Sequence, residues 1–255
     1  MSNAPALTAP PLWPIYWAEF VAELKKTFRQ PGFVIPSLCF PLGFYALFGL
    51  LMPHRGSFDG TTWFFATYGT FGVIGPALFG FGAALASERE AGWLDLKRVS
   101  PLPTGALLLA RIGMSLVFAV IIFLLLSTLA FVAGGVRLPL SAWMLLGLVL
   151  VLGTLPFCAL GLLIGSLARA RSAAGWVNLI YLPMGALSGL WFPLFLMPAV
   201  LQKLAYALPA YHLGQLSLAA SGQIKVVVWP HVAMLLLFTL VFASLAARAL
   251  RRSVK

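Results

Sequence analysis

Long apolar runs, separated by short polar segments, occupy most of the chain from residue 33 onward. About 20 apolar residues in a helix are enough to cross a hydrocarbon core of about 30 Å. A helix also satisfies its own backbone hydrogen bonds, which a lipid environment requires. The pattern therefore predicts an all-α, polytopic membrane protein with six transmembrane spans, over residues 33–52, 63–86, 106–132, 141–167, 174–192 and 228–249.

The segment before the first run has helical periodicity of a different kind. At 100° per residue, residues 13–32 separate into an apolar and a charged face, and Pro31 with Gly32 would end the helix. We predict an amphipathic interface helix in a cytoplasmic N-terminal segment, residues 1–32, followed by a transmembrane domain, residues 33–255. Whether this helix only anchors the chain or also contacts a cytosolic partner stays open. The apolar face holds Trp17, Phe20, Val21, Leu24 and Phe28, and the charged face holds Glu19, Glu23, Lys26 and Arg29.

Residues 198–225 are apolar enough to suggest a seventh span. Lys203, Pro209 and His212 disfavour a membrane-crossing helix there. A seventh crossing would also place the basic C-terminal end on the opposite side of the membrane. We therefore predict an external helical hairpin between the fifth and sixth spans, either as a pair of short helices or as a shallow re-entrant hairpin.

Composition and charge support the membrane assignment. Apolar residues make up 61% and charged residues 9% of the chain, whereas a soluble domain carries about 25% charged residues. A net charge of +11 would suit nucleic acid, but the basic side chains are spread among span ends, so we expect no nucleic-acid partner. Most of the 17 Lys and Arg residues lie on one side of the predicted spans. The positive-inside rule therefore places both termini in the cytoplasm.

The sequence lacks the groups that catalysis or proton transport inside a membrane requires. No Asp, Glu or His lies near the centre of a predicted span. No G-x-x-x-x-G-K-[ST] loop is present, and Cys39 and Cys158 have no metal-ligand spacing. We predict no catalytic residue, no metal and no cofactor on this chain, so any ATP would be bound by another chain. An ion-coupled secondary transporter and a non-transporting membrane assembly subunit remain as alternatives.

The most unusual polar segment, residues 87–105, follows the second apolar run. It holds three acidic side chains, although topology alone needs only basic ones. We predict a short interfacial helix that a docked soluble protein could move, and the alternative is a solvated connector. The residues expected to contact that protein are Glu88, Arg89, Glu90, Trp93, Leu94, Lys97 and Pro101.

The run LASEREAGWLDLKRVSPLPTGALLLAR, residues 85–111, resembles the segment after the second span of ABC-2 type permeases, the membrane subunits of many bacterial ABC exporters. A second stretch, residues 188–216, is similar to the region after the fifth span of that family. The matching residues are Glu88, Arg89, Glu90, Gly92, Leu94, Pro101, Leu102 and Arg111 in the first stretch, and Pro193, Pro198, Pro209 and Tyr211 in the second.

The resemblance implies a half-transporter. Residues 87–105 would form a coupling helix seated in a groove of a separate ABC ATP-binding subunit, which binds ATP and Mg²⁺. Two permease copies, as a homodimer or heterodimer, and two ATPases would form an exporter in the bacterial cytoplasmic (inner) membrane. Related permeases export drugs, peptides, lipids or polysaccharides. An uncharged substrate pathway would suit an amphiphilic or hydrophobic substrate, and its candidate residues are Thr67, Tyr68 and Asn178.

Overall fold

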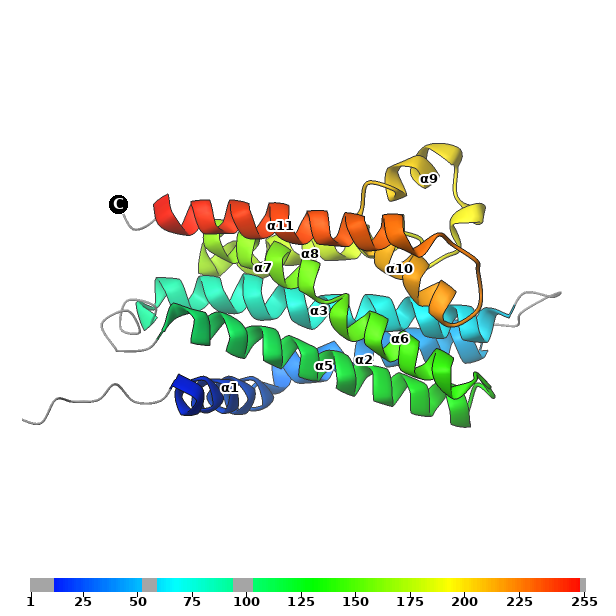
Figure 1. Cartoon of the computed structure of the whole chain (residues 1–255), viewed down its shortest axis with the longest axis horizontal. Helices are drawn as coiled ribbons and strands as arrows, with labels where there is room; N and C mark the ends of the chain where they lie inside the picture. Colours follow the sequence, from blue (N-terminus) through cyan, green and yellow to red (C-terminus); the bar gives the residue numbers. More distant parts are fainter. Residues whose placement is uncertain (1–11, 52–58, 94–102, 253–255) are drawn as a thin grey trace, which may run out of the picture.

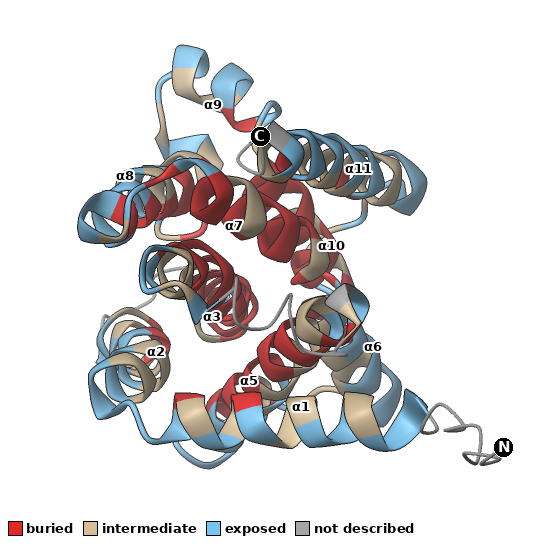
Figure 2. Cartoon of the chain, turned by 90° about the vertical axis from the view of Figure 1, so that its left-hand side faces the viewer, coloured by how far each residue is buried: buried red, intermediate tan, exposed pale blue. Residues whose placement is uncertain are grey.

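The computed structural model describes residues 12–51, 59–93 and 103–252, and all regular secondary structure within these ranges is helical, as predicted. Long helices lie side by side in a bundle, and α1 lies across one end of it (Figures 1 and 2). The elements are α1 (Leu12–Phe28), α2 (Pro31–Phe44), the π-helix η1 (Tyr45–Leu51), α3 (Gly60–Glu90), α5 (Thr104–Val132), α6 (Leu140–Leu152), α7 (Leu155–Leu167), α8 (Ala170–Leu187), the 3₁₀ helix η2 (Leu194–Leu196), α9 (Ala199–Ala205), α10 (Pro209–Ala220) and α11 (Val228–Arg252).

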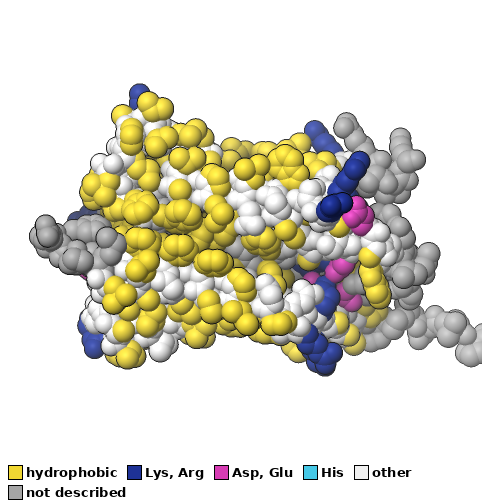
Figure 3. Space-filling model, turned by 180° about the vertical axis from the view of Figure 1, so that it is seen from behind, with side chains coloured by type: hydrophobic (Ala, Val, Ile, Leu, Met, Phe, Trp, Pro, Cys, Tyr) yellow, Lys and Arg dark blue, Asp and Glu magenta, His cyan; other side chains and the backbone are white. Residues whose placement is uncertain are grey.

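The two ends of the bundle differ from the belt between them. Apolar side chains cover most of the belt on the face shown in Figure 3, and charged side chains gather toward the ends. We name one end, which holds α1, the last turn of α3 and the C-terminal turn of α11, the charged end (Figure 1). The opposite end, which holds α9 and the first turn of α3, is the hairpin end. An apolar belt between polar ends is the surface that a bilayer favours.

The described residues include five helical segments that are long and apolar enough to cross a membrane, so the chain is a multi-pass membrane protein. They are Pro31–Leu51, Gly60–Glu90, Gly105–Val132, Leu140–Leu167 and Val228–Arg251. These segments cover all of the predicted spans except 174–192. That span corresponds to α8, which packs against α3 and α7 and carries Arg171 and Asn178. The sixth span stays a prediction.

Helix α3 forms the centre of the bundle. Most of its residues are buried, and it packs against α2, α5, α7, α8 and α10 (Figure 2). The contact with α7 is close because α7 carries Gly161 and Gly165 there. A Cβ atom at Gly165 would lie 2.5 Å from the backbone oxygen of Phe81, so no larger residue fits without a shift. Small residues at such positions allow the backbones of two helices to approach closely.

The predicted span 141–167 is not a single straight helix. It breaks into α6 and α7 at Gly153 and Thr154. Pro156 cannot donate a backbone hydrogen bond to the preceding turn, which favours a break at this point. A Cβ atom at Gly153 would also lie 2.2 Å from a methyl group of Leu213 in α10. The absence of a side chain at Gly153 therefore leaves room for Leu213 of α10.

The region between α8 and α11 contains the predicted pair of short helices. α9 projects from the hairpin end, whereas α10 is mostly buried and packs against α3, α6 and α11 (Figure 1). A buried hydrogen bond of 2.8 Å from the Thr70 hydroxyl to Ser217 Oγ joins α10 to α3. The side of the membrane on which this hairpin lies stays a prediction.

Candidate functional site

The Glu88–Arg89–Glu90 triplet lies in the last turn of α3, not in a loop. We expected the second span to end at residue 86, but the helix continues through Glu90 and the chain turns at Gly92, whose φ is 73°. Only glycine adopts this φ at little cost. The coupling helix was expected over residues 87–105, but residues 87–90 belong to α3. The expected contacts Leu94, Lys97 and Pro101 lie outside the described residues, and contact with a partner stays a prediction.

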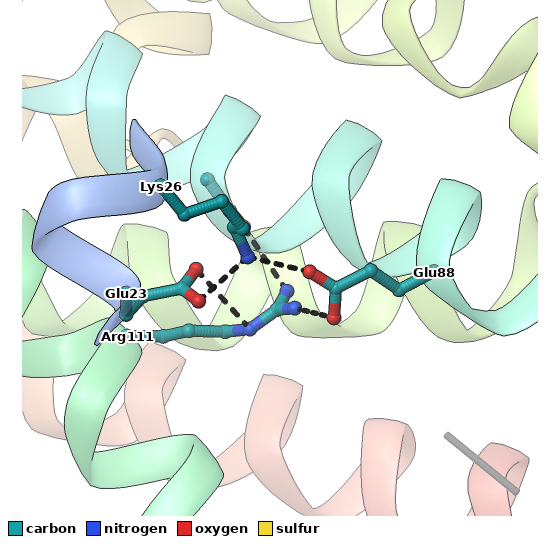
Figure 4. A network of polar contacts seen from close by, with 5 residues as sticks. Glu23, Lys26, Glu88 and Arg111 are labelled. Atoms are coloured by element: carbon teal, nitrogen blue, oxygen red, sulfur yellow. Dashed lines mark hydrogen bonds and ion pairs between the residues drawn. The ribbon is translucent and has the colours of Figure 1, made fainter. Parts of the chain in front are cut away.

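Glu88 belongs to a network of ion pairs that joins three helices (Figure 4). Lys26 Nζ donates to Glu88 Oε1 at 2.5 Å and to Glu23 Oε2 at 2.6 Å. Arg111 of α5 donates through Nη2 to Glu88 Oε2, and its Nε lies 3.8 Å from Glu23 Oε1. Because two carboxylates face two cations, the network is close to neutral, which reduces the cost of burying it.

Arg111 is the most buried member of this network. Its side chain is only 4% exposed, and its Nη1 donates to the Gly80 carbonyl oxygen at 3.2 Å. An arginine near the end of a membrane span commonly extends its side chain toward the membrane surface. Arg111 instead points into the bundle, because Glu23 and Glu88 supply the compensating charges there.

The charged face of α1 is also placed differently from our expectation. We assigned Glu23 and Lys26 to a face opposite the membrane, but Glu23 is buried between α1 and the bundle. Phe20 packs against α5, where a Cβ atom at Gly113 would lie 2.8 Å from its ring. The aromatic face is only partly outward: Trp17 is exposed, Leu24 is half-buried, and Phe28, although partly exposed, stacks on Phe118 of α5 at 5.3 Å. Part of the polar face thus turns inward to pair with Arg111.

Arg89 and Glu90 bind two further helices. Arg89 donates to the carbonyl oxygens of Ser166 and, at 2.7 Å, Ala168. These carbonyls lie at the C-terminal end of α7, where carbonyls lack helical partners and favour a cation. Glu90 Oε2 accepts a 3.1 Å hydrogen bond from the backbone N–H of Ala170, at the beginning of α8, where an anion is favoured. Three consecutive residues of α3 therefore join it to four helices. Glu88 contacts α1 and α5, Arg89 contacts α7, and Glu90 contacts α8.

A cavity of about 440 Å³ opens beside this turn. Its described lining includes the carboxylates of Glu19, Glu23 and Glu88, together with Lys26 and the indole of Trp93. Trp93 is 57% exposed, which is unusual for the largest apolar side chain. Of the predicted partner-contact residues, the structure therefore brings Glu88 and Trp93 to one surface of the charged end.

The predicted pathway residues do not meet in one cavity. Asn178 lines an apolar cavity of about 510 Å³ between α2, α3 and α8, whereas Thr67 lines a cavity of about 450 Å³ at the hairpin end. Tyr68 is fully buried, with its ring stacked on Phe44 at 5.8 Å. The sequence analysis missed Tyr181, whose ring lies 4.4 Å from that of Phe71 in the Asn178 cavity. Its spacing of three residues from Asn178 on one helix was a signal that could have revealed it.

Neither a catalytic centre nor a metal centre emerges from the part of the chain that the structure describes. In that part, no group of three or more His, Cys, Asp or Glu side chains could hold a metal ion. What the charged end does show is a junction of helices, in which the last turn of α3 is joined to α1, α5, α7 and α8.

Comparisons with known proteins agree with this architecture. The profile of the family described as ABC-2 type transporter matches residues 15–221. The chain is 31% identical over 239 residues to the transport permease YvfS of Bacillus subtilis (strain 168), covering 89% of this chain and 93% of that protein. It is 28% identical over 177 residues to the inner membrane transport permease YhhJ of Escherichia coli (strain K12), covering 68% of this chain and 47% of that protein. Because the family profile covers most of the bundle, including the Glu88–Arg89–Glu90 turn, the chain belongs to the ABC-2 type transporter family, as a multi-pass membrane transport permease.

Proposed function

We propose that this chain is the permease subunit of an ATP-driven exporter and that a separate ABC ATP-binding subunit docks at the charged end. The observation that carries the proposal is the last turn of α3. A displacement applied to this turn reaches α1 and α5 through Glu88, α7 through Arg89 and α8 through Glu90. ATP and Mg²⁺ would be bound by the partner, because the sequence has no phosphate-binding loop.

The position of α3 supports this role. It is the most buried long helix and packs against α2, α5, α6, α7, α8 and α10, so a small movement at its end changes the packing of the whole bundle. Packed helices of this kind tend to shift between discrete arrangements, because their close-packed surfaces do not deform smoothly. Nucleotide-dependent closure of two ATPases would thus bias the bundle between inward-facing and outward-facing states.

The surface beside this turn suits a docking partner. Trp93 is exposed next to a cavity rich in carboxylates, and exposed tryptophans are enriched at the energetic centres of interfaces. In this proposal Trp93 and the face of Glu88 that lines the cavity contact the ATPase. Glu90 would contact the ATPase only with the part of its side chain that stays exposed, because Oε2 already accepts a hydrogen bond from the backbone N–H of Ala170. Arg89, Leu94, Lys97 and Pro101 complete the contact.

The Asn178 cavity supports a hydrophobic or amphiphilic substrate. Aromatic side chains from α2, α3, α8 and the turn after α8 contribute to its apolar lining, among them Phe71, Tyr181 and Trp191. Asn178 adds one uncharged polar group that could orient a substrate. A second permease copy, identical or not, would face this cavity across the exposed apolar surfaces of α2 and α8, where Phe40 and Leu179 are exposed.

The proposed orientation places the charged end in the cytoplasm. Cysteine substituted for Ser172 should resist a membrane-impermeant thiol reagent applied from outside, whereas cysteine substituted for Gln223 should react. The reversed pattern would contradict the orientation. Native Cys39 is exposed and should first be replaced by serine.

The docking role can be tested with matched tryptophan variants. Trp93→Ala should weaken co-purification with the ATPase and lower transport-coupled ATP hydrolysis at least tenfold, because truncation of a central interface tryptophan costs about 2 kcal/mol or more. Trp229→Ala removes a tryptophan that is still more exposed, at the opposite end, and should change neither. Equal behaviour of the two variants would refute docking at Trp93. Transport that follows an ion gradient without ATP would instead favour a secondary transporter.

A further inference from the structure

The cavity at the hairpin end has a different chemistry from the Asn178 cavity. Its volume is about 450 Å³, and it lies between the beginning of α3, the turn after α8, and α10 with the residues that follow it. This volume is within the range of sites that bind small molecules. Polar groups converge on it from separate elements: Asp59 and Thr67 from α3 and its N-cap, Gln215 from α10, and Gln223 beyond it.

Asp59 is the one charged residue among the described residues that line this cavity. Its Oδ1 accepts from the backbone N–H of Thr62 at 3.0 Å, as an N-cap, and its Oδ2 accepts weakly from Gln223 Nε2 at 3.4 Å. A carboxylate has about four acceptor sites, so capacity remains for a ligand. Among the residues that the structure describes, no Lys or Arg pairs with it. Lys225 directly follows the lining residue Ile224 in the sequence, but its side chain is exposed and does not line the cavity.

The cavity also has an apolar, aromatic wall. The buried Trp63 lies one helical turn from Asp59 on the same helix, and Leu194 and Phe195 belong to η2. Aromatic faces attract organic cations, most strongly when the cation is partly removed from water. A metal ion suits this wall poorly, because Ca²⁺ needs six to eight oxygen ligands and only one carboxylate is present among the described lining residues.

We propose that this cavity binds an organic cation with an apolar body, whose positive charge lies near Asp59 and whose body lies against Trp63 and Phe195. The inference deepens the proposed function, since such a cation would be a substrate class leaving through the hairpin end. Binding itself does not depend on an ATPase. It can therefore be measured on the permease alone.

The test compares Asp59→Asn with the wild-type chain, both purified in a nonionic detergent. Asparagine is as good an N-cap as aspartate, so the helix start is preserved and only the charge is lost. We would measure binding of tetraphenylphosphonium by equilibrium dialysis, with triphenylphosphine oxide as a neutral ligand of similar shape. Thermal unfolding of both proteins checks that the variant folds.

Tetraphenylphosphonium should bind about two- to tenfold more weakly to Asp59→Asn, since Asp59 lies at an exposed rim where ion pairs are modest. The difference should shrink as salt is added. Triphenylphosphine oxide should bind the two proteins equally. Lys225→Gln should bind the cation at least as well as the wild-type chain.

Equal cation binding by the wild-type chain and Asp59→Asn would overturn the proposal, as would tighter binding of triphenylphosphine oxide than of the cation. Tighter binding of a neutral sugar-headed amphiphile, competing for the same site, would overturn it in favour of a glycosylated ligand. Because no ATPase is present, these outcomes are separate from a failure of the exporter assignment, which the Trp93 variants test.

Discussion

Replacing Arg111 with methionine would leave two buried or half-buried carboxylates facing one lysine. Methionine keeps much of the volume of the side chain but removes its charge and its hydrogen bonds to Glu88 and the Gly80 carbonyl. The carboxylate of Glu23, whose side chain is 6% exposed, would then share Lys26 with Glu88. Breaking a buried ion pair by removing one partner costs about 3–5 kcal/mol, because the remaining charge stays buried.

The matched comparison is Lys26→Met, which removes the other cation of the same network. Lys26 is 38% exposed, so water can replace much of its interaction, and its loss should cost about 1 kcal/mol. For a chain of this size, about 1 kcal/mol corresponds to roughly 2–4 °C in Tm. Arg111→Met should therefore lower the Tm by about 6–20 °C, and Lys26→Met by less than about 4 °C.

The assay measures thermal unfolding of each purified variant in the same detergent. The readout is the amount of protein that is still monodisperse after heating to each temperature. A third variant, Arg111→Met with Glu23→Gln, removes one charge of each sign and should recover part of the lost stability. A loss for Lys26→Met as large as that for Arg111→Met would refute the reasoning, because burial would then not determine the cost. No recovery in the double variant would show that the charge balance is unimportant.

Three further predictions concern other junctions. Gly165→Ala should lower the Tm, because its Cβ would lie 2.5 Å from a backbone oxygen of α3, whereas Gly175→Ala, with open space around the Cβ, should keep or raise it. Burial lowers the pKa of His212 below its ordinary value of 6.5, so its neutral form is the stable one in the fold. Neutral His212 therefore stabilises the fold above about pH 6.5, and this stabilisation is lost as the pH falls and the imidazole is protonated. The Tm should fall between pH 7.5 and 5, and the fall should be smaller for His212→Gln. Arg89→Ala should speed amide hydrogen exchange around the α7–α8 junction, because the α7 carbonyls lose their donor, whereas Arg171→Ala, at an exposed position, should leave exchange there unchanged.

Much of the fold could be predicted from the sequence because membrane-spanning helices are determined locally. A run of apolar residues of sufficient length favours a helix in lipid wherever its neighbours lie. Five predicted spans match helical segments for this reason. The break at Gly153 was missed, because its position depends on Leu213 of α10, which is distant in sequence. The apolar pattern of α6 and α7 continues through the break.

The candidate site was predicted only in part. The Glu88–Arg89–Glu90 triplet was identified from its unusual charge and from the family resemblance. Its partners could not be predicted, because Lys26 is 62 positions away from Glu88, and Ala168 is 79 positions away from Arg89. Helical periodicity places Glu23 and Lys26 on a polar face but does not say whether that face turns toward water or toward a buried arginine.

By itself the sequence determined the class of protein, the positions of five long apolar helices and the end at which acidic and basic residues concentrate. These properties follow from composition and local periodicity, which do not depend on how helices are arranged. Only the tertiary structure decided that Arg111 is buried, that α1 turns part of its charged face inward, and that one turn of α3 holds four other helices. Those features depend on pairing charges from distant segments, because an unpaired charge could not remain buried in this bundle.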